Sequence, residues 1–130
     1  MQPKTLKIIF WVSTLLIFIF EGVMPALTSQ TEMAKEGIRH LGYPAYFGIM
    51  LAVFKVLGSI AITVPQVPAT LKEWAYAGLT FDMVAASTSI WAVEGFSFNV
   101  FFPLIVLAVL MVSYFTYRKL NTLQYSKAIA

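Results

Sequence analysis

Four long apolar runs, separated by short polar segments, dominate the sequence. They cover residues 8–27, 43–64, 74–93 and 95–117, and each is at least 20 residues long. At ~1.5 Å per helical residue, each run is long enough to span the ~30 Å hydrocarbon core of a bilayer. We therefore predict an all-α fold: a four-transmembrane-helix bundle forming one integral membrane domain over 1–130, with helices at about 6–27, 43–64, 72–93 and 97–120.

The polar segments indicate how the runs are connected. Pro65 and Pro68 end the second run, because proline cannot continue a helix without losing a backbone hydrogen bond. Residues 32–41 predict a short helix lying along the membrane interface. A secretory signal peptide is the alternative interpretation of the first run, although Met24 and the charge of Glu21 fit a cleavage site poorly.

The composition agrees with a lipid environment. Apolar residues make up 59% of the chain and charged residues 12%, whereas soluble domains typically have about 45–50% and about 25%. The chain contains no cysteine, which excludes disulfides, thiolate nucleophiles and cysteine-ligated metal centres. The basic residues form no patch of the kind that binds nucleic acid, so we expect no nucleic-acid partner.

Lysine and arginine are distributed unequally between the two sides of the predicted bundle. Positive residues concentrate on the cytoplasmic side of membrane proteins, so this asymmetry predicts that both termini lie in the cytoplasm. Six positive residues fall on the predicted inner side and two on the outer: Lys4, Lys7, Lys72, Arg118, Lys119 and Lys127 against Lys35 and Arg39.

Three charged residues interrupt the apolar runs: Glu21, Lys55 and Asp82. Each costs about 2.5–3.5 kcal/mol at the centre of a membrane helix, so a compensating partner is expected. Lys55 and Asp82 lie at nearly the same depth, while Glu21 is about 7 Å closer to the outer side at ~1.5 Å per residue. We predict a Lys55–Asp82 ion pair. It is either a device that fixes helix register or part of a ligand pocket or proton path, and the sequence leaves both open.

Small residues flank these charges at helical spacing, and they predict close helix packing. The stripe on the second helix comprises Gly48, Ala52, Lys55 and Ser59, and the stripe on the third comprises Ala75, Gly78, Asp82, Ala86 and Ser89.

The segment at 39–46 (RHLGYPAY) supplies further candidate ligand contacts. We expect it to place His40, Tyr43 and Tyr46 over the outer mouth of the bundle, near Glu21 and Glu94. A single histidine in a loop is usually only solvated, which is the alternative for His40. Because it is the only histidine, no multi-imidazole metal site can form within one chain, and we predict no metal.

No phosphate loop, nucleophile elbow or HExxH motif is present, and the catalytic residues, if any exist, are unknown.

Four segments resemble the DoxX-like family of small bacterial four-helix membrane proteins: HLGYPAYF at 40–47, KVLGSIAITVP at 55–65, LKEWAYAGLTFD at 71–82 and MVSYF at 111–115. The resemblance covers nearly the whole chain and implies a four-helix bundle in the cytoplasmic membrane. Better-known relatives include subunits of thiosulfate:quinone oxidoreductase and of membrane-associated oxidative-stress complexes. The family pattern matches Lys55 and Asp82, and it carries over no catalytic residue.

These observations lead to two functional hypotheses. In the first, the chain is a non-catalytic accessory subunit that binds a small amphipathic molecule, such as a quinone, without a covalent cofactor. The outward-opening pocket would be edged by Glu21, Lys55, Asp82 and Tyr43, and any redox role would be that of a subunit of a quinone-dependent oxidoreductase. In the second, it is a scaffold or assembly factor for a membrane-protein partner or for further copies of itself. Ion or proton transport is a weaker third possibility, because 130 residues leave little room for two alternating halves.

Overall fold

The computed structural model of the chain describes residues 2–28 and 30–129, with side chains up to residue 123. The side chain of Lys127, used above to predict orientation, therefore lies outside the described residues. The described part is helical and contains no strand. In chain order the elements are α1 (Pro3–Ile17), the π-helical segment η1 (Phe18–Val23), α2 (Met24–Thr28), α3 (Glu32–His40), α4 (Ala45–Thr63), α5 (Ala69–Glu94), the 3-10 turn η2 (Phe98–Val100) and α6 (Phe101–Ile129).

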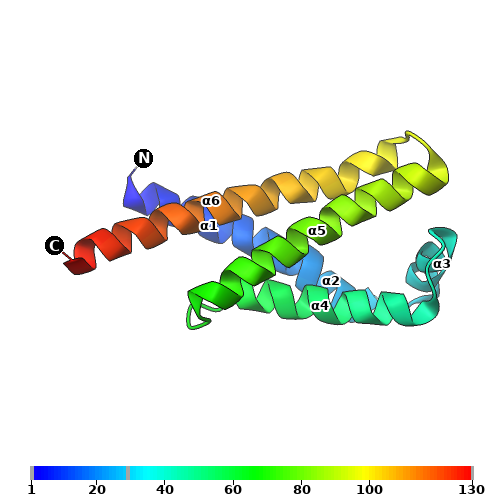
Figure 1. The fold of residues 1–130 in the computed structure, drawn as a ribbon, viewed down its shortest axis with the longest axis horizontal. Coiled ribbons are helices and arrows are strands. Elements are labelled where there is room, and N and C mark those ends of the chain that lie inside the picture. The colour runs from blue at the N-terminus through cyan, green and yellow to red at the C-terminus, as the bar shows by residue number, and fades with distance from the viewer. Residues whose placement is uncertain (1, 29, 130) are drawn as a thin grey trace.

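The long helices form a ring in which each packs against two others. α6 packs against α1 and α5, and α4 packs against α5 and η1. Both chain ends and the α4–α5 turn lie at one end of the molecule, whereas α3 and the α5–α6 connection lie at the other (Figure 1). We call these the terminal end and the α3 end. Because α1, η1 and α2 continue one another, the first fifth of the chain is one helix of 26 residues, Pro3–Thr28.

Prolines and glycines place the helix ends where backbone chemistry requires them. Pro3 and the residue after Pro68 begin α1 and α5, slightly earlier than the apolar pattern predicts, since proline at a helix start loses no hydrogen bond. Gly95 ends α5 with a φ of 77°, a left-handed conformation that glycine adopts without strain. Its N–H donates to the Trp91 carbonyl at 2.8 Å, which satisfies a carbonyl of the last turn.

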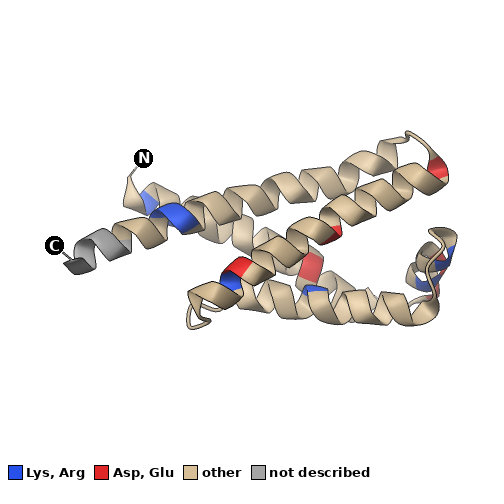
Figure 2. Ribbon diagram, viewed as in Figure 1, with Lys and Arg blue, Asp and Glu red and all other residues tan. Residues whose placement is uncertain are grey.

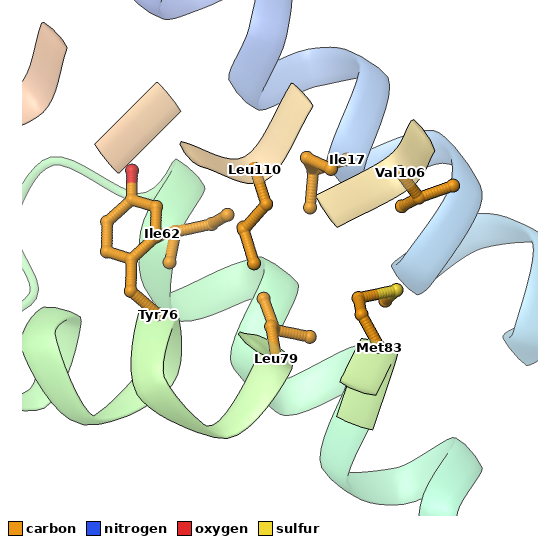
Figure 3. Close-up of a cluster of buried hydrophobic side chains, with 7 residues drawn as sticks. All are labelled: Ile17, Ile62, Tyr76, Leu79, Met83, Val106 and Leu110. Atoms are coloured by element: carbon orange, nitrogen blue, oxygen red, sulfur yellow. The ribbon is translucent and has the colours of Figure 1, made fainter. Parts of the chain in front are cut away.

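The apolar core lies where the four long helices meet. Ile17, Ile62, Tyr76, Leu79, Met83, Val106 and Leu110 converge there (Figure 3). A short polar chain crosses this core. The Ser113 hydroxyl lies 2.6 Å from that of Thr14 and 2.8 Å from that of Tyr76, so three buried hydroxyls satisfy one another without water.

Much of the outer surface is apolar, as expected for a protein in lipid. Large side chains such as Leu27, Trp74, Phe81 and Phe98 are more than two-thirds exposed. Within the described residues, three helices are long and apolar enough to cross a membrane: Pro3–Thr28, Ala45–Thr63 and Phe98–Leu123. α5 has 26 residues but is not among them. Asp82 and the hydroxyl side chains of α5 lower its mean hydropathy, which explains the difference from the four apolar runs of the sequence.

Candidate functional site

The three charges inside the bundle come together on three different elements. Lys55 of α4 places its Nζ 3.4 Å from Glu21 Oε2 in η1 and 3.5 Å from Asp82 Oδ2 in α5. Charged residues elsewhere in the molecule lie mainly toward the ends of the helices, as Figure 2 shows. We call Glu21, Lys55 and Asp82 the charge triad. The ion pair between Lys55 and Asp82 that the sequence suggested therefore includes a second carboxylate.

Glu21 is buried, Asp82 and Lys55 are partly buried, and the contacts among the three are long. The exposed side-chain fractions are 8% for Glu21, 13% for Asp82 and 27% for Lys55. Both ion-pair distances exceed the ~2.7–2.9 Å of a strong charge-assisted hydrogen bond. Among the described residues, Glu21 Oε2 and Asp82 Oδ2 are buried and accept no hydrogen bond. Buried oxygens normally have partners, so these two atoms have unused capacity to accept a proton or a donor group.

The backbone around Glu21 departs from a regular α-helix. Pro25 has no N–H to donate to the Glu21 carbonyl four residues earlier, and its ring crowds that carbonyl. The chain responds by widening into the π segment Phe18–Val23, at whose end the Met24 N–H donates to the Ile19 carbonyl. Such π segments are rare and often occur at functional sites. Here the widening includes Glu21 itself.

Small residues allow η1 and α4 to approach each other beside the triad. A methyl group at Gly22 would collide with the hydroxyl of Ser59, which is fully buried. Gly48, by contrast, faces Ile38 of α3. Of the stripe predicted for α4, Lys55 meets α5, whereas Gly48 meets α3 and Ser59 meets η1. The close approach of α4 to α5 is made by Gly58, which lies outside that stripe, against Leu79.

A groove of about 780 Å³ opens sideways between α4 and α5. Lys55 and Asp82 are its only charged lining residues among those described; the remainder are apolar or glycine. From the triad the groove extends toward the terminal end, where Leu71 and Trp74 line it. Gly78 also lines the groove, and a Cβ atom added at this position would meet no other atom within 4 Å.

A second, smaller cavity touches Lys55 from the other side. It has a volume of about 270 Å³ and is lined by residues of η1, α2, α3 and α4, including Pro25, Ile38 and Gly48. This cavity is directed toward the α3 end, which is the direction predicted for the pocket. Lys55 therefore lines both cavities, whereas Asp82 lines only the groove.

The outer candidates form a separate polar layer. His40 Nε2 lies 3.2 Å from Glu94 Oε1, and the Tyr43 hydroxyl bonds that of Ser89. Ser89 is seven residues beyond Asp82 on α5, about 10 Å along the helix. Tyr46 is 69% exposed on the surface. His40, Tyr43 and Tyr46 line neither cavity beside Lys55, so the structure does not bring them to the triad.

Lys72 has a role that the sequence analysis missed. Its side chain is 6% exposed, and its Nζ donates to the carbonyls of Val64, Ala61 and Ile62 at 2.8, 3.0 and 3.3 Å. Of these, the Val64 carbonyl also accepts from the Val67 N–H at 3.4 Å, whereas the Ala61 and Ile62 carbonyls belong to the last turn of α4, where intrahelical donors run out. A cation there also opposes the negative end of the helix dipole. The sequence signal for this role is the position of the lysine, a few residues after the prolines that end a helix.

The described residues contain no group of three or more metal-ligating side chains placed to hold a metal ion. A model of the DoxX-like family matches residues 9–113. The chain belongs to the DoxX-like family. The match runs from α1 into α6 and contains the whole charge triad. Comparison with curated proteins and with solved structures gives no match. As a DoxX-like chain with several membrane-crossing helices, it is a multi-pass membrane protein in contact with the lipid bilayer.

Proposed function

We propose that this DoxX-like protein crosses the cytoplasmic membrane four times, with α5 as the fourth span. The support is topological. α4 ends at the terminal end of the molecule, whereas α6 begins at the α3 end (Figure 1). If α4 and α6 both cross the bilayer, α5 must run back across it to connect them. At 26 residues it is ~39 Å long, which exceeds the ~30 Å hydrocarbon thickness.

The orientation we propose places the terminal end in the cytoplasm. Lys4, Lys7, Lys72, Arg118 and Lys119 lie toward that end, and among the described residues only Lys35 and Arg39, both on α3, oppose them. This distribution follows the positive-inside rule. The polar face of α3 then lies at the outer membrane interface.

We propose that the protein is an accessory subunit that binds a small amphipathic molecule of the quinone class in the α4–α5 groove. The observation that carries this proposal is the pairing of Lys55 and Asp82 in an otherwise apolar groove open to the side. Its volume of about 780 Å³ falls within the ~300–1,000 Å³ typical of small-molecule sites. An apolar tail would lie along Leu71 and Trp74, and the polar head would reach the triad.

Charge balance favours a neutral, hydrogen-bonding head group over an anionic one. With all three side chains ionised, the triad carries one excess negative charge, so an added anion would be repelled in a medium of low dielectric constant. The Lys55 ammonium can donate to a quinone carbonyl. Asp82 Oδ2, which accepts no hydrogen bond from the described residues, can accept from a quinol hydroxyl. The same pair thus suits both redox forms.

Tryptophan fluorescence tests this site, because Trp74 lines the groove and Trp11 and Trp91 do not. In a Trp11→Phe/Trp91→Phe background, titration with decylubiquinone in detergent is expected to quench Trp74 to saturation. Adding Asp82→Asn or Lys55→Met should weaken the apparent affinity at least several-fold, since each removes one contact to the head group. The matched control is Trp11→Phe/Trp74→Phe, which leaves Trp91 outside the groove and should show only linear quenching. Equal linear quenching of both tryptophans would end the proposal.

A scaffold function is the second candidate, and open space at Gly78 favours it. A partner helix can approach closely only where the groove is lined by small residues, here Gly58, Ala61, Ala75, Gly78 and Ala85. Gly78→Leu should displace a partner helix from native membranes, while Asp82→Asn should leave it bound. The groove would be assigned to a protein partner by two results together. The partner would be retained by the wild type and Asp82→Asn but lost from Gly78→Leu, and quinone would give no saturable quenching.

A further inference from the structure

A third cavity lies at the terminal end of the bundle, separate from the charge triad. It has a volume of about 410 Å³ and lies where the start of α1, the α4–α5 turn and the distal part of α6 meet. Its walls combine apolar and polar residues: Lys7, Phe10, Trp11, Thr63, Pro65, Val67, Ala69, Lys72, Tyr117, Leu120 and Asn121. None of these is acidic.

The cavity carries positive charge and hydrogen-bond donors that the described protein leaves unused. Lys7, Trp11, Tyr117 and Asn121 each carry an N–H or O–H group, and none makes a hydrogen bond to another described side chain or carbonyl. Lys72 adds a second positive charge. Its three N–H groups already donate to α4 carbonyls, so it attracts an anion electrostatically without donating to it.

The nearest acidic side chain on α5, Glu73, is engaged elsewhere. Its Oε2 accepts from the Tyr114 hydroxyl at 2.9 Å, and its Oε1 lies 3.5 Å from Arg118. Glu73 does not line the cavity. The positive potential of Lys7 and Lys72 therefore faces the cavity without a carboxylate inside it.

We propose that this cavity binds the phosphate-bearing head group of an anionic phospholipid. The position at the ends of apolar helices is where lipid head groups lie, and Trp11 and Tyr117 are side chains that favour this depth. Basic pockets between membrane helices on the cytoplasmic side typically bind anionic head groups. Phe10, Trp11 and Leu120 offer apolar walls to the upper part of the acyl chains. This site is distinct from the proposed quinone site and does not depend on it.

The experiment compares lipids in protein purified in detergent and then delipidated. Added phosphatidylglycerol should raise the melting temperature of the wild type, while zwitterionic phosphatidylcholine at the same concentration should not. Lys7→Gln removes an exposed charge with no described partner, so it should fold normally. It is expected to weaken the phosphatidylglycerol effect about five-fold in concentration, the value of one lysine near an anionic surface. Asn121→Ala in the same background should weaken it further.

Lys119→Gln is the matched control, because Lys119 is also exposed and close to Asn121 in α6 but does not line the cavity. It should respond to phosphatidylglycerol like the wild type. Equal losses for Lys7→Gln and Lys119→Gln would show general surface attraction and overturn the site. Equal stabilisation by phosphatidylcholine would also overturn it, as would full protection by inorganic phosphate alone, since neither needs an anionic lipid.

Discussion

Ser59 of α4 packs directly against Gly22 of the π segment, with no room for a side chain at position 22. This contact holds the two elements that carry Lys55 and Glu21 side by side. The geometry of the charge triad therefore depends on the absence of a side chain at Gly22.

Gly22→Ala should therefore destabilise the protein, although alanine normally favours helices. Overpacking of this kind typically costs about 1–3 kcal/mol, more than the gain in helix propensity of ~1 kcal/mol. Thermal unfolding in detergent, followed by circular dichroism, should show a lower midpoint. Adding Ser59→Gly to Gly22→Ala should recover part of the loss, because it removes the colliding hydroxyl.

Gly37→Ala provides the control for that measurement. Gly37 lies in α3, and an added methyl there meets nothing within 4 Å. Its unfolding midpoint should stay unchanged or rise slightly. If Gly22→Ala behaved like Gly37→Ala, the close packing of η1 on α4 would be incorrect.

Removal of the triad's cation should be more damaging than removal of all its charges. Lys55→Met leaves two carboxylates buried without a counter-charge, and breaking a buried pair in this way typically costs about 3–5 kcal/mol. The triple variant Glu21→Gln/Lys55→Met/Asp82→Asn has no buried charge and should be more stable than Lys55→Met alone. Chemical unfolding in mixed micelles measures both. Lys35→Met, at an exposed position on α3, is the control and should match the wild type.

Equal stability of the single and triple variants would contradict this prediction. It would mean that the carboxylates find other compensation, such as water entering from the groove. The quinone proposal would then also lose its polar anchor, since the ligand head would compete with that water.

Lys72→Met should loosen the end of α4. It removes three hydrogen bonds from a charged donor. A hydrogen bond of this kind typically contributes about 1.5–3 kcal/mol to stability. Amide hydrogen exchange should speed up in residues 60–64 while the start of α4 stays protected. Lys119→Met is the matched control, and unchanged exchange in both variants would show that the α4 end does not depend on Lys72.

Much of this fold follows from the sequence because membrane helices are specified by long, local patterns. The apolar runs predicted the long helices, and the cost of charge in lipid correctly indicated that Lys55 and Asp82 would meet. Prolines at 65 and 68 marked the end of α4. These inferences need only local composition and the physics of the bilayer.

The remaining features depend on how the helices pack. The widening at Glu21 follows from Pro25, but no spacing rule reveals its extent or the contact of Gly22 with Ser59. Nor does a sequence show that the groove opens sideways toward Trp74, away from Tyr43 and His40. Sequence alone predicts only an interfacial charge at Lys72, because its three carbonyl acceptors become its neighbours only when α4 and α5 pack side by side.

The four-span topology can be tested directly because the chain has no cysteine of its own. Single cysteines at the exposed positions Gln66 and Thr122 should react with a membrane-impermeant maleimide only after the cytoplasmic side is opened. Cysteines at Glu36 and Asn99, which lie toward the α3 end, should react in intact spheroplasts. Asn99 is decisive, since it follows α5. If α5 stayed on one side of the membrane, cysteines at 66 and 99 would label from the same side, and the bundle would have three crossings.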